Sequence, residues 1–85
     1  MAKEITPIKL WNLYQKYDYL GEEYKYKNWI FRDNGGQSEM AIDNKKTGKQ
    51  IESVTMHWIS KKDFIDLMNR IEKKNPKNMT EWLSE

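Results

Sequence analysis

Residues 60–76 constrain the fold more than any other segment, because they combine both ends of a helix with one apolar stripe. Ser60 suits the N-cap position, and Asp63 three residues later completes a capping pair. Asn75 and Pro76 are typical of a helix stop. The apolar residues between these ends recur at helical spacing: Phe64, Leu67, Met68 and Ile71. We therefore predict an amphipathic helix whose stripe must be covered by another layer.

Three extended runs can supply that layer. Residues 24–32 are rich in aromatic side chains, and residues 39–43 and 51–59 alternate apolar with polar side chains. The Asp-Asn-Gly-Gly stretch at residues 33–36 predicts the first turn, and residues 44–48 predict the second. Together these runs predict a three-stranded antiparallel meander.

Further helix signals lie at the two ends of the chain. Thr6 is a good N-cap for a helix over residues 7–19, and Gly21 suits a left-handed C-terminal position. For residues 80–83 two interpretations stay open: a short third helix that docks Trp82, or a frayed tail. The predicted element order is therefore helix, three strands and helix, followed by this short third helix or by the frayed tail.

This order predicts an α+β fold in two layers, with the helices on one face of the sheet. We treat residues 1–85 as a single domain, because a chain of 85 residues can build only one small core. The sequence contains no cysteine, so packing alone must hold the fold.

Hydropathy and net charge bear on whether the chain has a membrane or a nucleic acid as its partner. The longest apolar run, Trp29 to Phe31, is far shorter than the ~20 residues of a membrane-spanning helix. We expect a cytoplasmic protein with no membrane partner. The formal net charge is only +2, which is low for a dedicated nucleic-acid-binding module.

Catalytic chemistry has little support in the sequence. His57 is the single histidine and has no cysteine to pair with. One histidine with scattered carboxylates matches no structural metal-site spacing. We therefore expect no enzymatic activity, no catalytic residues, no metal ligands and no cofactor.

Aromatic residues in the first predicted strand indicate a partner surface. Alternation places Tyr24 and Tyr26 on one face and Trp29 and Phe31 on the other. Two helices can cover only one face, so we predict that some of these aromatic residues remain exposed and bind a partner. Three occupants are considered: a heterologous protein, a second copy of the chain in a homodimer, and the chain's own tail through Trp82.

Basic residues form a second candidate surface. The lysines crowd the second turn and the start of the second helix, and one arginine lies near the first turn: Lys45, Lys46, Lys49, Lys61, Lys62 and Arg32. Lys61 and Lys62 sit where the helix dipole disfavours cations. They either bind an anion there or form an ordinary solvated first turn, and both interpretations stay open.

The element order is similar to that of double-stranded-RNA-binding domains, in which a helix, three strands and a second helix follow one another. In this chain Ser60, Lys61 and Lys62 open the last helix, as basic residues do in that family. The resemblance would span most of residues 7–71 and implies nucleic-acid binding. It is one of order, because the family's Gly-Pro-x-His loop is absent where residues 33–36 stand.

Two functional hypotheses follow. The first is a non-enzymatic interaction protein that binds or inhibits a larger host protein or nucleoprotein complex, as an accessory protein of a phage or mobile element would. The lysine-rich, arginine-poor composition favours an AT-rich coding sequence of this kind. The alternative is a small nucleic-acid-binding module that uses its lysine loops, with aromatic residues for base stacking.

Overall fold

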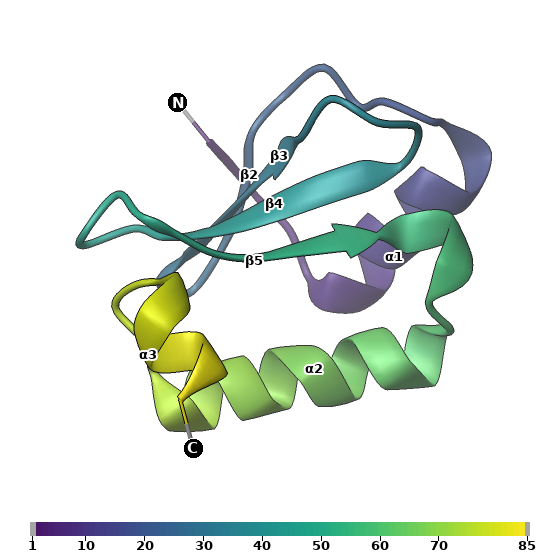
Figure 1. Cartoon of the computed structure of the whole chain (residues 1–85). Coiled ribbons are helices and arrows are strands. Elements are labelled where there is room, and N and C mark those ends of the chain that lie inside the picture. Colours follow the sequence, from purple (N-terminus) through teal and green to yellow (C-terminus); the bar gives the residue numbers. More distant parts are fainter. Residues whose placement is uncertain (1, 85) are drawn as a thin grey trace.

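The computed structural model describes residues 2–84 and has helices packed against a five-stranded mixed sheet (Figure 1). The strands are β1 (Lys3–Glu4), β2 (Tyr24–Tyr26), β3 (Trp29–Asp33), β4 (Glu39–Asn44) and β5 (Gln50–Thr55). The helices are α1 (Pro7–Lys16), the 3-10 turn η1 (Met56–Trp58), α2 (Lys61–Lys74) and α3 (Met79–Leu83). The predicted α+β class is confirmed, whereas the predicted three-stranded meander is too small.

The sheet order is β1-β2-β3-β4-β5. Strands β2 to β5 form an antiparallel meander, and β1 adds a parallel strand at the edge of β2. Residues 3–4 carried no strand signal, because two residues are too few to show a pattern. The extra strands also separate this fold from the element order of double-stranded-RNA-binding domains.

The predicted first strand, residues 24–32, is in fact two strands joined by a tight turn. Lys27 and Asn28 form this turn between the paired residues Tyr26 and Trp29. Lys27 has a φ of +54°, which is uncommon for a lysine. The Asn28 carbonyl accepts a 2.7 Å hydrogen bond from the backbone N–H of Lys45, so the neighbouring hairpin holds the turn in place.

This turn overturns the predicted exposure of the strand aromatics. Residues directly opposite each other in a hairpin share a face, and Tyr24 pairs with Phe31 as Tyr26 pairs with Trp29. All four therefore face the helices. Trp29 and Phe31 are buried in the core, and Tyr24 and Tyr26 are half-buried against it. Their predicted place on the open face of the sheet is therefore wrong, and partner binding by these residues stays a prediction.

The predicted helices agree with the structure more closely than the predicted strands do. Thr6 accepts a hydrogen bond from the backbone N–H of Lys9, and Ser60 accepts one from the backbone N–H of Asp63. Helix α2 ends before Asn75, which adopts the left-handed conformation. Helix α1 is shorter than predicted, because Tyr17 is already extended. The predicted C-terminal helix is present as α3.

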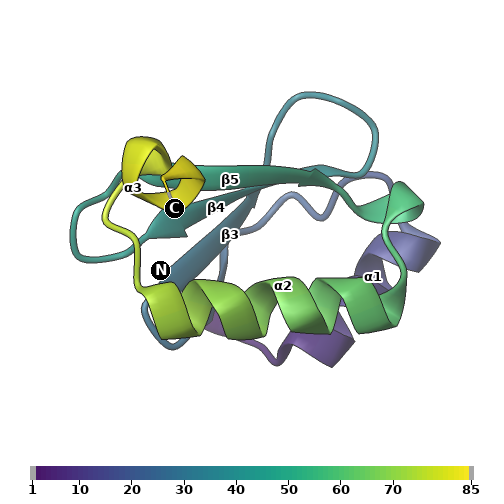
Figure 2. The same ribbon diagram turned by 60° about the horizontal axis from the view of Figure 1, so that its bottom comes forward.

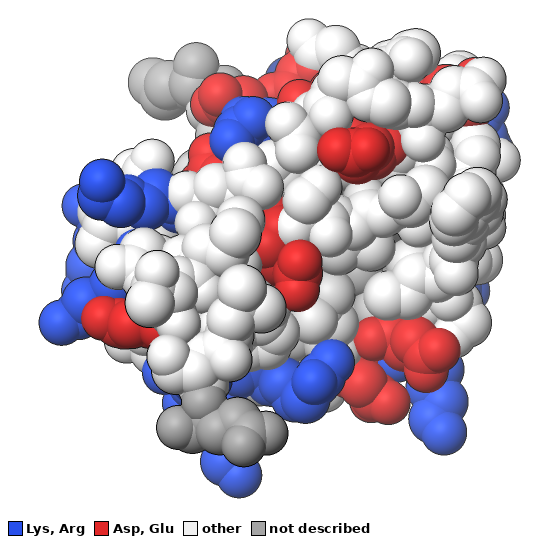
Figure 3. Space-filling model, in the orientation of Figure 1, with Lys and Arg blue, Asp and Glu red and all other residues white. Residues whose placement is uncertain are grey.

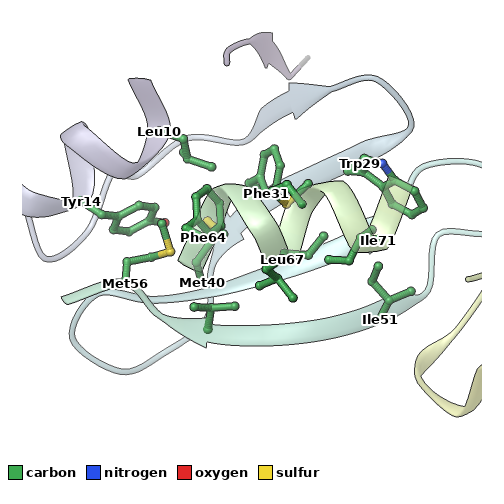
Figure 4. Packing of buried hydrophobic residues seen from close by; sticks show 13 residues of the cluster. Leu10, Tyr14, Trp29, Phe31, Met40, Ile51, Met56, Phe64, Leu67 and Ile71 are labelled. Atoms are coloured by element: carbon green, nitrogen blue, oxygen red, sulfur yellow. The ribbon is translucent and has the colours of Figure 1, made fainter. Parts of the chain in front are cut away.

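The core lies between the sheet and helices α1 and α2. Figure 4 shows Trp29 and Phe31 of β3 in the same cluster as Phe64, Leu67 and Ile71, which come from α2. Figure 2 shows α1 and α2 below the sheet, with α3 beside the start of β5. The buried apolar cluster draws on α1, β3, β4, β5, η1 and α2. Among residues 2–84, no helix has the length and apolar character needed to cross a membrane.

Candidate functional site

The face of the sheet that the helices leave uncovered is polar, not aromatic. Arg32 lies there and donates hydrogen bonds to Asp43 at 2.8 and 3.2 Å and to Gln50 at 3.1 Å. The hydrogen bond to Asp43 raises the pKa of the Arg32 guanidinium. Asn34 donates to Ser53 at 3.2 Å on the same face. Arg32, predicted as an anion-binding residue, is therefore committed to an ion pair within the sheet.

Exposed aromatic side chains occur instead where α1 ends and η1 begins. Trp58 is 88% exposed, and Tyr17 and Tyr19 are each more than half exposed. The Nε2 atom of His57 lies 3.7 Å from a carboxylate oxygen of Asp18. Because Trp58 follows His57 and the two tyrosines flank Asp18, this contact places the backbone segments that carry the three aromatics next to each other. We call Tyr17, Tyr19 and Trp58 the aromatic surface.

The backbone beneath Trp58 is held by several hydrogen bonds. The backbone N–H of Met56 donates to the carbonyl of Ser38 at 2.8 Å, and that of His57 donates to the Ser38 hydroxyl at 3.1 Å. The side-chain amide of Gln15 donates to the carbonyl of Met56 at 3.1 Å. Met56 itself is fully buried. Trp58 is thus presented to solvent by a firmly anchored turn.

The exposure of Trp58 contradicts the predicted strand over residues 51–59. Strand alternation would have placed Trp58 on the same buried face as Val54 and Met56. The strand instead ends at Thr55, and the 3-10 turn that follows has about three residues per turn. Met56 therefore points into the core while Trp58 points outward. Sequence reasoning missed this because apolar and polar residues continue to alternate past the point where the strand ends.

Asp33 anchors the segment that carries the two tyrosines. It accepts hydrogen bonds from the Tyr14 hydroxyl at 2.6 Å, from the backbone N–H of Leu20 and from that of Gly21 at 2.7 Å. Burial acts to raise the pKa of Asp33, but these hydrogen bonds outweigh it and the pKa is lowered. Burial, followed by the bond to Asp33, raises the pKa of Tyr14. The pair is a structural anchor for residues 17–21.

The predicted lysines separate into two groups at opposite ends of α2. Lys45, Lys46 and Lys49 lie in the β4–β5 turn, near the C-terminal end of α2. Lys61 and Lys62 occupy its first turn, about 20 Å away along the helix axis. The two groups cannot contact the same small anion.

Lys61 has a local partner that the sequence did not reveal. Its ammonium lies 5.4 Å from the centre of the Trp11 ring, within the range of a cation–π contact. The indole N–H of Trp11 donates to the carbonyl of Ile59 at 2.9 Å, so the ring is fixed beside the start of α2. This contact offsets the unfavourable helix dipole at Lys61, which favours the solvated-turn interpretation.

The tail does not cover the open sheet face. Trp82 of α3 donates its indole N–H to Glu52 of β5 at 2.7 Å. Arg70 and Lys74 of α2 lie 5.9 and 5.8 Å from the centre of its ring. Trp82 therefore sits between β5 and α2, at the side of the two layers.

Neither a metal site nor a similarity to known proteins identifies a function for this chain. Within the part of the chain that the structure describes, no three His, Cys, Asp or Glu side chains are placed to hold a metal ion. Comparison with protein-family models, curated proteins and solved structures found no match to this chain. The candidate site therefore depends on the chain's own geometry.

Proposed function

We propose that this chain is a non-enzymatic interaction protein that binds a protein partner through the aromatic surface. The observation that carries the proposal is the 88% exposure of Trp58 on an anchored turn. A tryptophan left in water forfeits the stabilisation that burying its ring would give. Binding a partner recovers that stabilisation.

The surroundings of Trp58 resemble those of an interface hot spot. Tryptophan and tyrosine are enriched among the residues that dominate binding energy, and a polar rim usually surrounds them. Here Asp18, His57 and Gln37 provide such a rim, since the Gln37 side-chain amide donates to Asp18 at 3.0 Å. The anchored backbone also lowers the conformational entropy lost on binding.

In its fuller form, the proposal is that the partner is a larger host protein or nucleoprotein complex, and that binding inhibits it. The small size and lysine-rich composition of the chain support an accessory protein of a phage or mobile element. A second copy of the chain is the competing occupant of the same surface.

The test compares two exposed apolar residues at different ends of the molecule. Trp58→Ala removes the centre of the aromatic surface, and Leu83→Ala is the control because Leu83 is 71% exposed on α3. Affinity capture from extracts of the native host, with quantitative mass spectrometry, should recover a protein that wild type and Leu83→Ala retain and Trp58→Ala loses.

Analytical ultracentrifugation tests whether a second copy of the chain, and not a different protein, occupies the aromatic surface. If wild type dimerises at micromolar concentration and Trp58→Ala does not, the surface joins two copies and the proposal of a heterologous partner is wrong. If capture by wild type and Trp58→Ala is identical, Trp58 contributes nothing to binding.

A further inference from the structure

The β2–β3 and β4–β5 turns lie side by side and carry a second surface that is independent of the aromatic one. Trp29, which follows the β2–β3 turn, pairs with Asn44, which precedes the β4–β5 turn. The backbone N–H of Lys45 joins the two turns through its 2.7 Å hydrogen bond to the Asn28 carbonyl. Lys25 and Lys27 of the first hairpin are thereby placed beside the lysines of the second.

The loop before α3 extends this surface. The hydroxyl of Thr47 donates to the carbonyl of Lys77 at 2.7 Å, and the side-chain amide of Asn44 donates to the carbonyl of Pro76 at 2.9 Å. We define the lysine surface by its six members: Lys25, Lys27, Lys45, Lys46, Lys49 and Lys77. Figure 3 shows basic side chains gathered at the left, over the β4–β5 hairpin and the loop before α3.

Few carboxylates lie beside these lysines: Glu4 contacts Lys25, and Glu81 accepts the backbone N–H of Lys77 at 3.0 Å. Lys25 has an ion-pair contact of 3.6 Å with Glu4, which is 84% exposed. Among residues 2–84, no carboxylate lies within ion-pair distance of the other five members of the surface. The neighbouring ammonium of Lys25 lowers the pKa of Lys45, as expected where like charges crowd. The lysine surface is therefore a local excess of positive charge on a nearly neutral chain.

A cleft continues the surface toward α1. It has a volume of about 530 Å³, and Lys9, Lys25 and Lys27 line it together with Thr6. Lys9 thus brings a further ammonium from a third element to the same end of the molecule. An extended anion lying across the hairpins would meet lysines from three elements, and Glu4 is the carboxylate that also lines the cleft.

The chemistry of the surface favours a nucleic-acid backbone over other anions. The exposed residues between the lysines are small and polar, Thr47 and Gly48, with no large apolar side chain that would insert into a membrane. No arginine belongs to the surface, although arginine dominates bidentate recognition of carboxylates in protein interfaces. Lysines at intervals suit repeated phosphates, which they neutralise as point charges without reading sequence.

We propose that the lysine surface binds the phosphate backbone of nucleic acid without sequence specificity. Lys45 and Lys46 lie at its centre, joined to the first hairpin through the backbone of Lys45. Lys61 and Lys62 lie at the far end of α2 and take no part.

The test uses two double variants that change charge equally at different places. Lys45→Glu with Lys46→Glu, and Lys61→Glu with Lys62→Glu, each take the formal net charge from +2 to about −2. The probe is a fluorescein-labelled 20-base-pair DNA duplex of arbitrary sequence, followed by fluorescence anisotropy. Circular dichroism confirms folding, and Lys45→Gln with Lys46→Gln serves as a neutral pair should the charge reversal unfold the chain.

Wild type should bind the duplex at 50 mM salt and lose affinity by roughly 500-fold at 200 mM, if about five phosphates are neutralised. The Lys45 and Lys46 reversal should weaken binding by about tenfold or more and make the salt slope shallower by about two. The Lys61 and Lys62 reversal should change affinity by less than about threefold, through net charge alone.

Three results would overturn the proposal. The first is no binding of the duplex at 50 mM salt. The second is an equal loss in both reversals, which would indicate attraction by net charge and not a localised surface. The third is binding to vesicles of phosphatidylcholine and phosphatidylserine, lost in the Lys45 and Lys46 reversal, without binding to DNA, because the surface would then recognise a membrane.

Discussion

The hydroxyl of Tyr14 donates a 2.6 Å hydrogen bond to Asp33, and this contact joins helix α1 to the end of β3. The same carboxylate accepts backbone N–H groups from Leu20 and Gly21, so it organises the segment that presents Tyr17 and Tyr19. One ionised side chain thus links the core to the edge of the aromatic surface.

Asp33→Asn should lower the free energy of unfolding at pH 7 by about 1–3 kcal/mol. The carboxylate uses both oxygens: Oδ1 accepts from the Tyr14 hydroxyl, Oδ2 accepts from the Gly21 N–H, and the Leu20 N–H is shared between them at 3.1 Å. An amide has only one acceptor oxygen and cannot accept from all three donors. Urea denaturation measures the loss. If Asp33→Asn is as stable as wild type, the hydrogen bonds to Asp33 contribute nothing net.

The same carboxylate predicts a pH dependence. The pKa of Asp33 in the folded chain is below its ordinary value of 3.8. Its contribution to stability is therefore fully present above that ordinary value and is lost as the pH falls through the lower folded pKa. Urea midpoints between pH 7 and pH 2 should fall less steeply for Asp33→Asn than for wild type. Parallel curves would show that Asp33 does not carry the acid sensitivity.

Truncations of Trp29 and Leu67 should both behave as core mutations. Leu67→Ala should lower the free energy of unfolding by ~2–5 kcal/mol, and Trp29→Ala by ~3–5 kcal/mol. Trp29→Ala also deprives Glu72 of the indole N–H that donates to it at 2.7 Å. Trp58→Ala is the matched control, since an exposed side chain should change stability by less than about 0.5 kcal/mol. A large loss in Trp58→Ala would mean that the turn depends on its ring.

The sequence predicts helices well, because their capping signals are local. It predicts poorly which face of the sheet a side chain occupies, because strand pairing decides that. Capping by Thr6 and Ser60 depends on neighbouring residues, and both helices begin where expected. The turn at Lys27 has no Asn-Gly signature and is held by Lys45, a residue far along the chain. Missing that turn separated Tyr24 and Tyr26 from Trp29 and Phe31, whereas all four share the face that the helices cover.

The candidate surfaces show the same division. The lysine turn over residues 45–49 was recognisable from composition, because a basic loop between two strands is exposed wherever it lies. The sequence did not show that this turn lies beside Lys25, Lys27 and Lys77. That proximity follows from the sheet order and from the contact of Thr47 with the loop before α3. The exposure of Trp58 depends on where β5 ends, and no residue among 51–59 marks that end, because the alternation of apolar and polar residues continues past it.

Single reversals in the first turn of α2 should differ, although both add negative charge near the same helix end. Lys62→Glu should raise the free energy of unfolding by ~0.3–1 kcal/mol, because the helix dipole favours an anion there. Lys61→Glu should gain little, since it also loses a cation–π contact of about 0.5–1 kcal/mol with Trp11. Thermal melting of the two variants and of Lys61→Glu in a Trp11→Phe background measures this. Equal gains in both single variants would exclude an energetic role for the Trp11 contact.

The last prediction concerns the free edge of the sheet. Strand β5 ends the sheet order, and the backbone N–H of Ser53 donates to the Glu52 carboxylate at 2.9 Å while Trp82 donates to the other oxygen of that group. Trp82 thus helps to hold the Glu52 carboxylate over the Ser53 N–H. An edge-strand N–H that is left uncovered can pair with a strand of another chain. Trp82→Ala should therefore accelerate hydrogen exchange at the Ser53 amide and increase concentration-dependent association, measured by exchange mass spectrometry and light scattering. Leu83→Ala, on the same helix but exposed, should leave both unchanged. If Trp82→Ala and Leu83→Ala exchange and associate as wild type does, the edge is protected by Glu52 alone and α3 has no part in guarding it.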